Sequence, residues 1–256
     1  MSLKVFVGYD SREKVAYEVL KHSIEKYTSS DVKIIPLYHQ ELRRQGYFQR
    51  PWLTEAVTGN RIDLVDGRPF STEFSHTRFL VPALMKYNGW ALFMDSDMIF
   101  NKADIQKVFD LIDNKYAVMC VQHRHVVKSG EKMDGAPQQN YHRKNWSSFV
   151  LFNCGHPANK KLTPEYVNTA AGGTLHAFSW LDDSLIGGIP GCWNWISGSS
   201  RSDMIPKVVH FTEGGPWFHS KKDVPYAEKW DEIYNNMMEL RPAPNDEILK
   251  VDYANC

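Results

Sequence analysis

Residues 91–100 read Ala-Leu-Phe-Met-Asp-Ser-Asp-Met-Ile-Phe, and this stretch decides the fold class. Two carboxylates, Asp95 and Asp97, interrupt an otherwise apolar run, and a buried strand does not accept charged side chains without a partner. The apolar flanks predict a core strand whose end opens into a cleft. In extended backbone the side chains at positions i and i+2 point the same way, so both carboxylates can face one ligand. Two anionic oxygens suit a divalent cation such as Mn²⁺ or Mg²⁺.

The composition fits one large domain and argues against several other classes of protein. The chain has 256 residues, of which 43% are hydrophobic, and its 30 lysines and arginines balance 30 aspartates and glutamates, so we expect no nucleic-acid partner. The four cysteines lie far apart, which excludes a zinc ribbon or a disulfide scaffold. The sequence contains no run of about eighteen apolar residues, so we expect no transmembrane span. The N-terminus shows no secretory signal pattern, and we therefore expect a cytoplasmic location.

Apolar runs that alternate with helical patterns predict an α/β fold with a mixed, mainly parallel sheet between helices. Strands are predicted at 3–8, 32–37, 90–94, 117–121, 149–152 and 205–211. Helices are predicted at 12–27 (with Ser11 as N-cap), 74–87, 104–111 and 225–240. Pro82 within 74–87 suggests a kink or a start nearer residue 80. Residues 47–72 look irregular, and the basic, aperiodic segment 123–146 is interpreted as a loop or lid.

Ligands of such sheets bind at the carboxyl ends of the strands. The polar residues that follow apolar runs are therefore the candidates for a site, and they are Tyr9, Asp10, Ser11, Asp95, Asp97, Asn153 and His210. Their position predicts one cleft along a single edge of the sheet.

A second motif lies at residues 207–217, which read Lys-Val-Val-His-Phe-Thr-Glu-Gly-Gly-Pro-Trp. His210 ends an apolar strand, and Gly214 and Gly215 would let backbone N–H groups approach an anion. Alone, this segment also fits a core histidine followed by an ordinary turn. Beside the acidic strand, the imidazole completes a reasonable set of Mn²⁺ ligands together with phosphate oxygens.

Taken together, the motifs resemble the GT-A fold glycosyltransferases, most closely glycosyltransferase family 8, which includes glycogenin and bacterial galactosyltransferases. Four segments are similar to the family's motifs and occur in the family's order: 6–10, 75–84, 92–98 and 210–217. Weaker matches are Leu-Phe-Asn-Cys-Gly at 151–155, Trp-Leu-Asp-Asp-Ser-Leu at 180–185, and Trp193-Asn194. The closing motif is one residue shorter than the family's and lacks its lysine, for which Lys221 or Lys222 is the candidate replacement.

The resemblance implies a retaining, metal-dependent transfer of a sugar from a nucleoside-diphosphate sugar, with UDP expected, to a hydroxyl of a glycan or another acceptor. The implied ligands of Mn²⁺ or Mg²⁺ are Asp95, Asp97 and His210. The implied nucleotide-binding residues are Tyr9, Asp10, Arg78, Ser96, Gly214, Gly215 and Lys221. The implied catalytic or sugar-binding residues are Asn153, Asp182 and Asp183.

The resemblance also implies one domain over 1–256, with a nucleotide-binding half at 1–100, a sugar and acceptor half at 101–220, and a C-terminal helix and tail at 221–256. Arg78 is expected to pair with phosphate or with the motif carboxylates, unless it is a plain surface arginine. If the reaction inverts configuration, Asp182 or Asp183 must act as general base. The tryptophans at 180, 193, 195 and 217 are expected to divide between sugar stacking and core packing.

Two other classes of function remain open. A phosphatase of the haloacid dehalogenase type also uses Asp-x-Asp after a strand, although that class places the nucleophile on its first strand. A non-catalytic nucleotide-sugar binding protein would retain the nucleotide and metal residues without turnover. Release of nucleoside diphosphate from a sugar nucleotide separates these possibilities.

Overall fold

A six-stranded mixed sheet in the order β12-β8-β11-β6-β1-β2 forms the centre of the molecule. The computed structural model describes residues 2–57, 59–123, 131–132, 136–137, 143, 145–240 and 251–256. β1 (Leu3–Gly8) runs parallel to β2 (Val32–Leu37) and β6 (Trp90–Met94), and β8 (Val118–Cys120) runs parallel to β12 (Ile186–Gly188). β11 (Phe149–Asn153) is antiparallel to both neighbours, β6 and β8. The predicted mixed, mainly parallel α/β sheet is confirmed.

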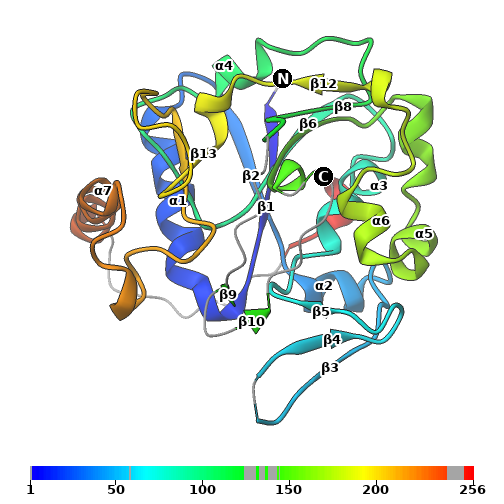
Figure 1. Cartoon of the computed structure of the whole chain (residues 1–256). Coiled ribbons are helices and arrows are strands. Elements are labelled where there is room, and N and C mark those ends of the chain that lie inside the picture. Colours follow the sequence, from blue (N-terminus) through cyan, green and yellow to red (C-terminus); the bar gives the residue numbers. More distant parts are fainter. Residues whose placement is uncertain are drawn as a thin grey trace.

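Helices cover both faces of this sheet because its central strands are apolar on both sides. Val5 and Leu92 point into the layer that α1 (Lys14–Tyr27) completes, whereas Phe6 and Phe93 point into the opposite layer. That second layer contains α3 (Val81–Leu84), α5 (Pro164–Thr169) and α6 (Gly172–His176). Figure 1 shows α1 on one side of β1 and these three helices on the other.

A second, three-stranded sheet continues from the acidic motif. β7 (Met98–Phe100) follows β6 almost directly and pairs antiparallel with β14 (Val208–His210), which pairs in turn with β13 (Trp195–Ile196). α7 (Ala227–Leu240) packs its buried Trp230 and Ile233 beside α1. The late strand covers only Val208–His210 of the predicted 205–211, whereas the C-terminal helix 227–240 is close to the predicted 225–240.

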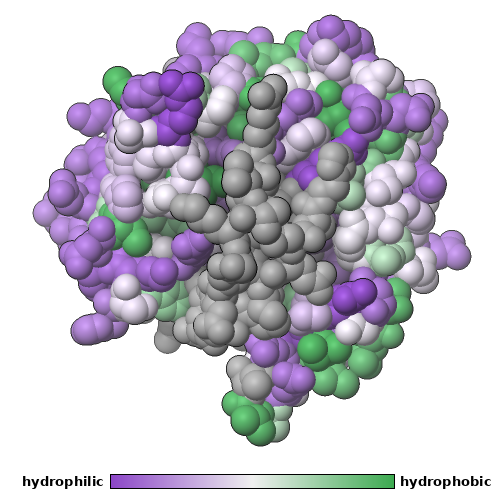
Figure 2. Space-filling view, in the orientation of Figure 1, coloured by the Kyte–Doolittle hydropathy of each residue, from purple (hydrophilic) through white to green (hydrophobic). Residues whose placement is uncertain are grey.

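The interval 47–72 contains an antiparallel three-stranded sheet, which the sequence analysis did not predict. Its strands are β3 (Trp52–Thr54), β4 (Arg61–Asp63) and β5 (Pro69–Phe70). The strands are too short to show an alternation, so proline and glycine dominated the pattern. The hairpin projects from the body of the molecule (Figure 1), and Figure 2 shows hydrophobic surface at that end. The exposed aliphatic side chains of this region are Leu53, Val57, Leu64 and Val65.

The helices differ from prediction in their starts. α1 begins at Lys14, after a 3-10 turn that Asp10 caps by accepting the amide of Arg12, so Ser11 is not the N-cap. Within the predicted helix 74–87, a 3-10 turn at Thr77–Leu80 precedes the short α3, which begins at Val81, in agreement with the alternative start nearer residue 80 predicted from Pro82.

Several short elements complete the description. The other helices are α2 (His39–Arg44) and α4 (Gln106–Phe109), and β9 (Glu131–Lys132) pairs with β10 (Ala136–Pro137). The 3-10 helices are Ser11–Glu13, Thr77–Leu80, Trp146–Ser148, Pro157–Lys161, Asp183–Leu185, Gly191–Asn194, His219–Lys221 and Tyr253–Asn255. Within the described ranges, none of the helices has the length and apolar character needed to cross a membrane.

The C-terminal residues 251–256 pack against the end of β2. The fully buried Tyr253 donates its hydroxyl to Pro36 O at 2.6 Å and accepts the amide of Tyr38 at 2.9 Å. Gln45 binds the same segment through Val251 O and the amide of Tyr253. One side chain thus joins the tail to the strand that leads into α2.

Tyr253→Ala is expected to lower the free energy of unfolding by about 3–5 kcal/mol, because it leaves a cavity where an aromatic ring was buried. Tyr253→Phe should cost about 1–3 kcal/mol, because the amide of Tyr38 and the carbonyl of Pro36 lose a buried partner. Urea denaturation measures both. Equal losses in the two variants would contradict the assignment of separate packing and hydrogen-bond contributions.

Candidate active site

Two sheets bring the acidic motif and the distant histidine together. Asp95 and Asp97 lie in the turn between β6 and β7, and His210 is the last residue of β14. In the pairing of β14 with β7, His210 lies opposite Met98, and the amide of Phe211 donates to Asp97 O at 2.8 Å. The ligand atoms of Asp95, Asp97 and His210 all lie within 4.8 Å of one another. The predicted grouping is therefore present in the structure.

Arg78 is buried beside this group of three side chains. Its guanidinium lies 4.9 Å from the centroid of the Phe93 ring and 5.2 Å from that of Phe74, and only 5% of the residue is exposed. Its Nη1 atom lies 2.8 Å from Asp95 Oδ1 and donates to Ser147 O at 2.9 Å. The structure thus pairs Arg78 with a motif carboxylate, one of the two predicted partners.

Buried polar groups fix the position of the His210 ring through its Nδ1 atom. Its Nδ1 atom lies 2.9 Å from Asn194 Oδ1, while Asn194 Nδ2 donates to Ser148 Oγ at 2.9 Å. His210 Nε2 has no hydrogen-bond partner among the described residues and lies 3.3 Å from Asp97 Oδ1. Ser148 also binds the acidic turn directly, because its carbonyl accepts the amide of Asp95 at 2.9 Å.

An ion pair between Asp10 and Arg12 fixes the loop that follows β1. Asp10 is 1% exposed and accepts Arg12 Nε and Nη2 at 3.1 and 3.0 Å, as well as the amide of Glu73 at 3.0 Å. Burial alone would raise the pKa of Asp10, but hydrogen bonds and charge from Arg12 outweigh it and hold that pKa below its usual value. These bonds occupy the oxygens that a nucleobase contact needs, so the predicted role of Asp10 in base recognition stays a prediction with a competing partner.

Tyr9 lies at the end of β1 within an aromatic cluster. Its ring makes edge contacts with Tyr17 at 5.5 Å and Tyr38 at 5.4 Å between centroids. Tyr9 is 8% exposed, so stacking on a nucleobase requires the ring to use its remaining open surface or to turn. Tyr38, which follows β2 and is more exposed, is a base-stacking candidate that the sequence analysis missed.

Glu13 is a buried carboxyl group that was not among the predicted site residues. It is 3% exposed, and burial together with repulsion from Asp97 and Asp10 raises its pKa to about 8. Its proton therefore limits the negative charge beside the acidic motif at neutral pH.

Glu13→Gln is expected to raise the melting temperature of the metal-free protein, by an amount that grows with pH. Below the ordinary glutamate pKa of 4.5, both folded and unfolded chains carry the proton. Between that value and about pH 8 the unfolded chain releases a proton that the folded chain retains, so the free energy of unfolding falls as pH rises. Melting curves from pH 4 to pH 9 test this, with the exposed Glu25→Gln on α1 as control; a pH-independent gain would contradict it.

The structure corrects the expected position of Asn153. Because β11 runs antiparallel to β6, Phe149 pairs with Met94 beside the acidic turn. Asn153 pairs with Trp90, at the opposite end of the strands. Four residues of strand separate the two ends by about 14 Å. The side chain of Asn153 donates to Tyr116 O at 3.1 Å, in a structural role. Ser147 and Ser148, which precede β11, lie instead at the end of the strands that faces the site.

Asp182 and Asp183 lie on an exposed turn before β12. Asp183 forms an ion pair with Arg143, whose guanidinium also donates to Ala177 O at 2.7 Å. Neither aspartate belongs to the group of cation ligands, so their catalytic role stays a prediction. Most of the predicted basic lid, including Arg124, His125, Lys128, His142 and Lys144, lies outside the described residues.

The remaining predicted nucleotide residues have local structural roles. Gly214 has a φ of +93°, and a Cβ at Gly215 would lie 2.1 Å from the Trp217 ring, so both positions require glycine for backbone or packing reasons. Ser96 is buried between the two aspartates, and its Oγ has no hydrogen-bond partner in the described part of the chain. Lys221 ends a short 3-10 helix and is half-buried. Their contacts with a nucleotide remain predictions.

The tryptophans are mainly core residues. Trp180, Trp193 and Trp195 are each at most 8% exposed, whereas Trp217 is half-buried. Trp217 packs on Phe211 and Trp230, and its Nε1 has no hydrogen-bond partner within the described ranges. Trp217 is therefore the candidate of the four for a sugar contact.

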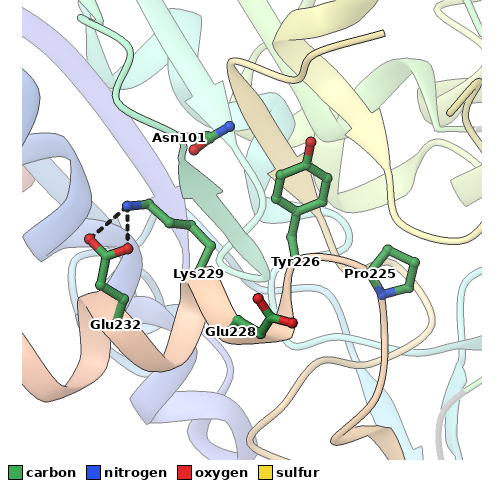
Figure 3. A pocket seen from close by; sticks show the side chains of 6 residues that line it. All are labelled: Asn101, Pro225, Tyr226, Glu228, Lys229 and Glu232. Carbon is green, nitrogen blue, oxygen red and sulfur yellow. Dashed lines mark hydrogen bonds and ion pairs between the residues drawn. The ribbon is translucent and has the colours of Figure 1, made fainter. Parts of the chain in front are cut away.

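A separate groove of about 400 Å³ lies at the start of α7. Figure 3 shows its lining residues and the ion pair that Lys229 forms with Glu232. They are Asn101, Pro225, Tyr226, Glu228, Lys229 and Glu232. None of the predicted site residues lines this groove, so it does not supply the chemistry of the acidic motif.

Comparison with solved structures identifies the fold. The bifunctional glycosyltransferase WbbM superposes with a TM-score of 0.61 at 18% identity, and GlyE of Streptococcus pneumoniae with 0.58 at 15%. The match covers 93% of this chain in both cases, but only 51% of WbbM and 63% of GlyE, so the chain spans between half and two thirds of their length. The galactosyltransferase LgtC, solved with donor and acceptor sugar analogs, gives 0.54 at 11% identity over 91% of this chain and 96% of LgtC. At these identities the likeness shows the fold alone, and that fold is GT-A.

Comparison of the sequence identifies the family. No protein-family model matches the chain. Protein CDI of Arabidopsis thaliana is 49% identical over 232 residues, which cover 89% of this chain and 84% of the plant protein. Identity at this level over most of both chains shows that the protein belongs to the family of Protein CDI.

Proposed function

We propose that this protein transfers a sugar from a nucleoside-diphosphate sugar, with UDP as the expected nucleotide, to an acceptor hydroxyl. The observation that carries the proposal is the convergence of Asp95, Asp97 and His210 beside the carboxyl ends of β1 and β6. In a parallel α/β sheet this edge is where nucleotides bind. The solved structures that share the fold are named as glycosyltransferases, which supports the same class of reaction.

The residues fit a divalent cation. Two carboxylates and one imidazole form a donor set suited to Mn²⁺ or Mg²⁺. Their ligand atoms lie within 4.8 Å of one another, near the ~4.2 Å that separates two opposed ligands at about 2.1 Å from an ion. His210 Nε2 lies 3.3 Å from Asp97 Oδ1 and lacks a hydrogen-bond partner among the described residues, so a cation would serve both atoms.

The charges of the site are arranged for an anionic leaving group. The charge of Arg78 offsets that of Asp95, and Glu13 carries a proton at neutral pH, which limits the negative charge beside the site. A bound divalent cation would make the site net positive and supply Lewis-acid stabilisation of the departing diphosphate. Tyr9 and Tyr38 would position the base, and Arg78 would keep Asp95 oriented toward the cation. If the enzyme retains configuration, the leaving phosphate can accept the proton of the acceptor hydroxyl.

The competing functions are less well supported. The haloacid dehalogenase class places its nucleophilic aspartate after the first strand of the chain, whereas Asp95 and Asp97 follow β6 in a GT-A sheet. A non-catalytic binding protein has the same nucleotide and metal residues, and turnover separates it from an enzyme.

Release of nucleoside diphosphate from a panel of UDP-, GDP- and ADP-sugars tests the proposal. We expect release from one donor in the presence of Mn²⁺ or Mg²⁺, and none with a chelator. Thermal shift with each nucleotide and Mn²⁺ selects the donor beforehand, because a ligand that binds only the folded state raises the melting temperature. Stabilisation without turnover, for every acceptor tried, would favour the binding protein. Hydrolysis of simple phosphate esters, in the presence of metal or without it, would contradict both and favour the phosphatase.

A further inference from the structure

We propose that Asn194 is a positioning residue that fixes the tautomer of His210 and thereby directs the Nε2 lone pair toward the cation. This inference rests on the proposed function of the site. A backbone carbonyl begins a chain of hydrogen bonds whose directions are all determined. The chain runs through Asn145, Ser148, Asn194 and His210.

The first bond has only one possible direction. Ser148 Oγ lies 2.7 Å from Asn145 O, and a carbonyl oxygen can only accept, so the single hydroxyl proton of Ser148 is committed there. Asn145 adopts a left-handed backbone with a φ of 64°, a conformation that asparagine tolerates better than most residues. The residue that precedes the 3-10 helix Trp146–Ser148 thus supplies a fixed acceptor beside the site.

The second and third bonds follow from the first. Because the proton of Ser148 is used, its Oγ must accept from Asn194, which places Nδ2 of the amide toward Ser148 at 2.9 Å. The amide oxygen then faces His210 Nδ1 at 2.9 Å, and an amide oxygen can only accept. His210 therefore carries its proton on Nδ1, and its Nε2 is left as a lone-pair donor.

Burial makes this arrangement costly to change. Ser148, Asn194 and His210 are each at most 3% exposed, so water does not replace a lost partner. Reversing the amide of Asn194 would set its NH₂ group against a protonated Nδ1, or shift the histidine proton to Nε2. A proton on Nε2 would point at Asp97 Oδ1, 3.3 Å away, and occupy the place of a cation.

Ser148 gives the chain a second connection. Its carbonyl accepts the amide of Asp95, while its hydroxyl orients Asn194. One residue therefore positions the acidic turn through its backbone and the imidazole through its side chain. Groups that orient a ligating histidine typically contribute 10–100-fold to metal affinity.

The test reads the tautomer in the metal-free protein and the cation affinity separately. The protein is labelled with ¹⁵N-histidine, and His210 is assigned among the ten histidines by its absence in His210→Gln. At about pH 8.5, above the usual titration range of histidine, wild type is expected to show the proton on Nδ1. Mn²⁺ affinity is measured by titration calorimetry on the same samples.

Three variants distinguish positioning from a general structural effect. Asn194→Asp retains an acceptor for Nδ1–H, and we expect the wild-type tautomer with Mn²⁺ affinity equal or higher. Asn194→Leu removes that acceptor, so the Nε2–H form should appear and Mn²⁺ affinity should fall by about 10–100-fold. Ser148→Ala, a smaller change that preserves packing, frees the amide of Asn194 to reverse and should also populate the Nε2–H form.

The outcomes separate this inference from the proposed function. Wild type with the proton on Nε2, or Asn194→Leu and Ser148→Ala with an unchanged tautomer and unchanged Mn²⁺ affinity, would overturn the inference and leave the glycosyltransferase proposal standing. Wild type with Nδ1–H but no Mn²⁺ or Mg²⁺ binding, with or without nucleotide, would overturn the proposed cation site itself.

Discussion

Asp97→Asn is expected to abolish metal-dependent donor binding and turnover. The carboxylate of Asp97 is one of the three proposed cation ligands, and its Oδ1 lies 3.3 Å from His210 Nε2. An amide is a weaker ligand and carries no charge, so Mn²⁺ affinity should fall by more than the roughly 100-fold typical of residues that only orient a ligand. Mn²⁺ titration and nucleoside diphosphate release measure the two effects.

The fold of Asp97→Asn should be intact. The backbone bond from Phe211 to Asp97 O does not depend on the side chain. Asp110→Asn, at the exposed end of α4, is the matched control and should change neither cation affinity nor turnover. Donor affinity that is unchanged in Asp97→Asn with Mn²⁺ present would remove Asp97 from the cation site.

Arg78→Met is expected to lower the free energy of unfolding of the metal-free protein by about 3 kcal/mol. Removing one partner of a buried ion pair leaves the other charge uncompensated, at a cost of about 3–5 kcal/mol. Asp95 retains 14% exposure of its side chain, which places the estimate at the low end. Methionine preserves the packing against Phe74 and Phe93, so the loss reports on charge rather than on volume. Urea denaturation without metal measures it.

A double-mutant cycle with Asp95→Asn tests the cause. If the buried charge of Asp95 is responsible, the double variant should recover most of the stability that Arg78→Met loses, yet remain inactive, because a cation ligand is missing. Saturating Mn²⁺ should also restore part of the stability of Arg78→Met. Strictly additive losses in the cycle would show that Arg78 stabilises the fold by another route.

The strands of the central sheet could be predicted because the information is local. The central strands β6 and β11 are short apolar runs, and burial on both faces explains why no alternation interrupts them, whereas β2 carries the exposed Lys33. The direction of β11 could not be predicted, because it depends on how the preceding segment 123–146 returns to the sheet. Because β11 is antiparallel to β6, Asn153 lies at the end of the strands away from the site, and Ser147 and Ser148 lie beside the site.

In the candidate site too, residues marked by a local sequence pattern could be predicted, whereas residues defined by contacts between distant segments could not. Asp95 and Asp97 were found from an unbalanced charge within an apolar run, and His210 from its position after a strand. Asn194, Ser148 and Glu13 carry no comparable signal, because their roles come from contacts between segments far apart in the chain. The ion pair of Asp10 with Arg12 shows the converse, since a residue in the expected place has its carboxylate already engaged.

The central claim is that Asp95, Asp97 and His210 bind one cation. Pulsed electron paramagnetic resonance of bound Mn²⁺ tests it most directly, because the spectrum reports nitrogen nuclei coordinated to the ion. We predict an imidazole nitrogen coupling in wild type that disappears in His210→Gln, and loss of bound Mn²⁺ in Asp97→Asn. Mn²⁺ that binds wild type without such a coupling, or with a coupling that survives in His210→Gln, would contradict the account.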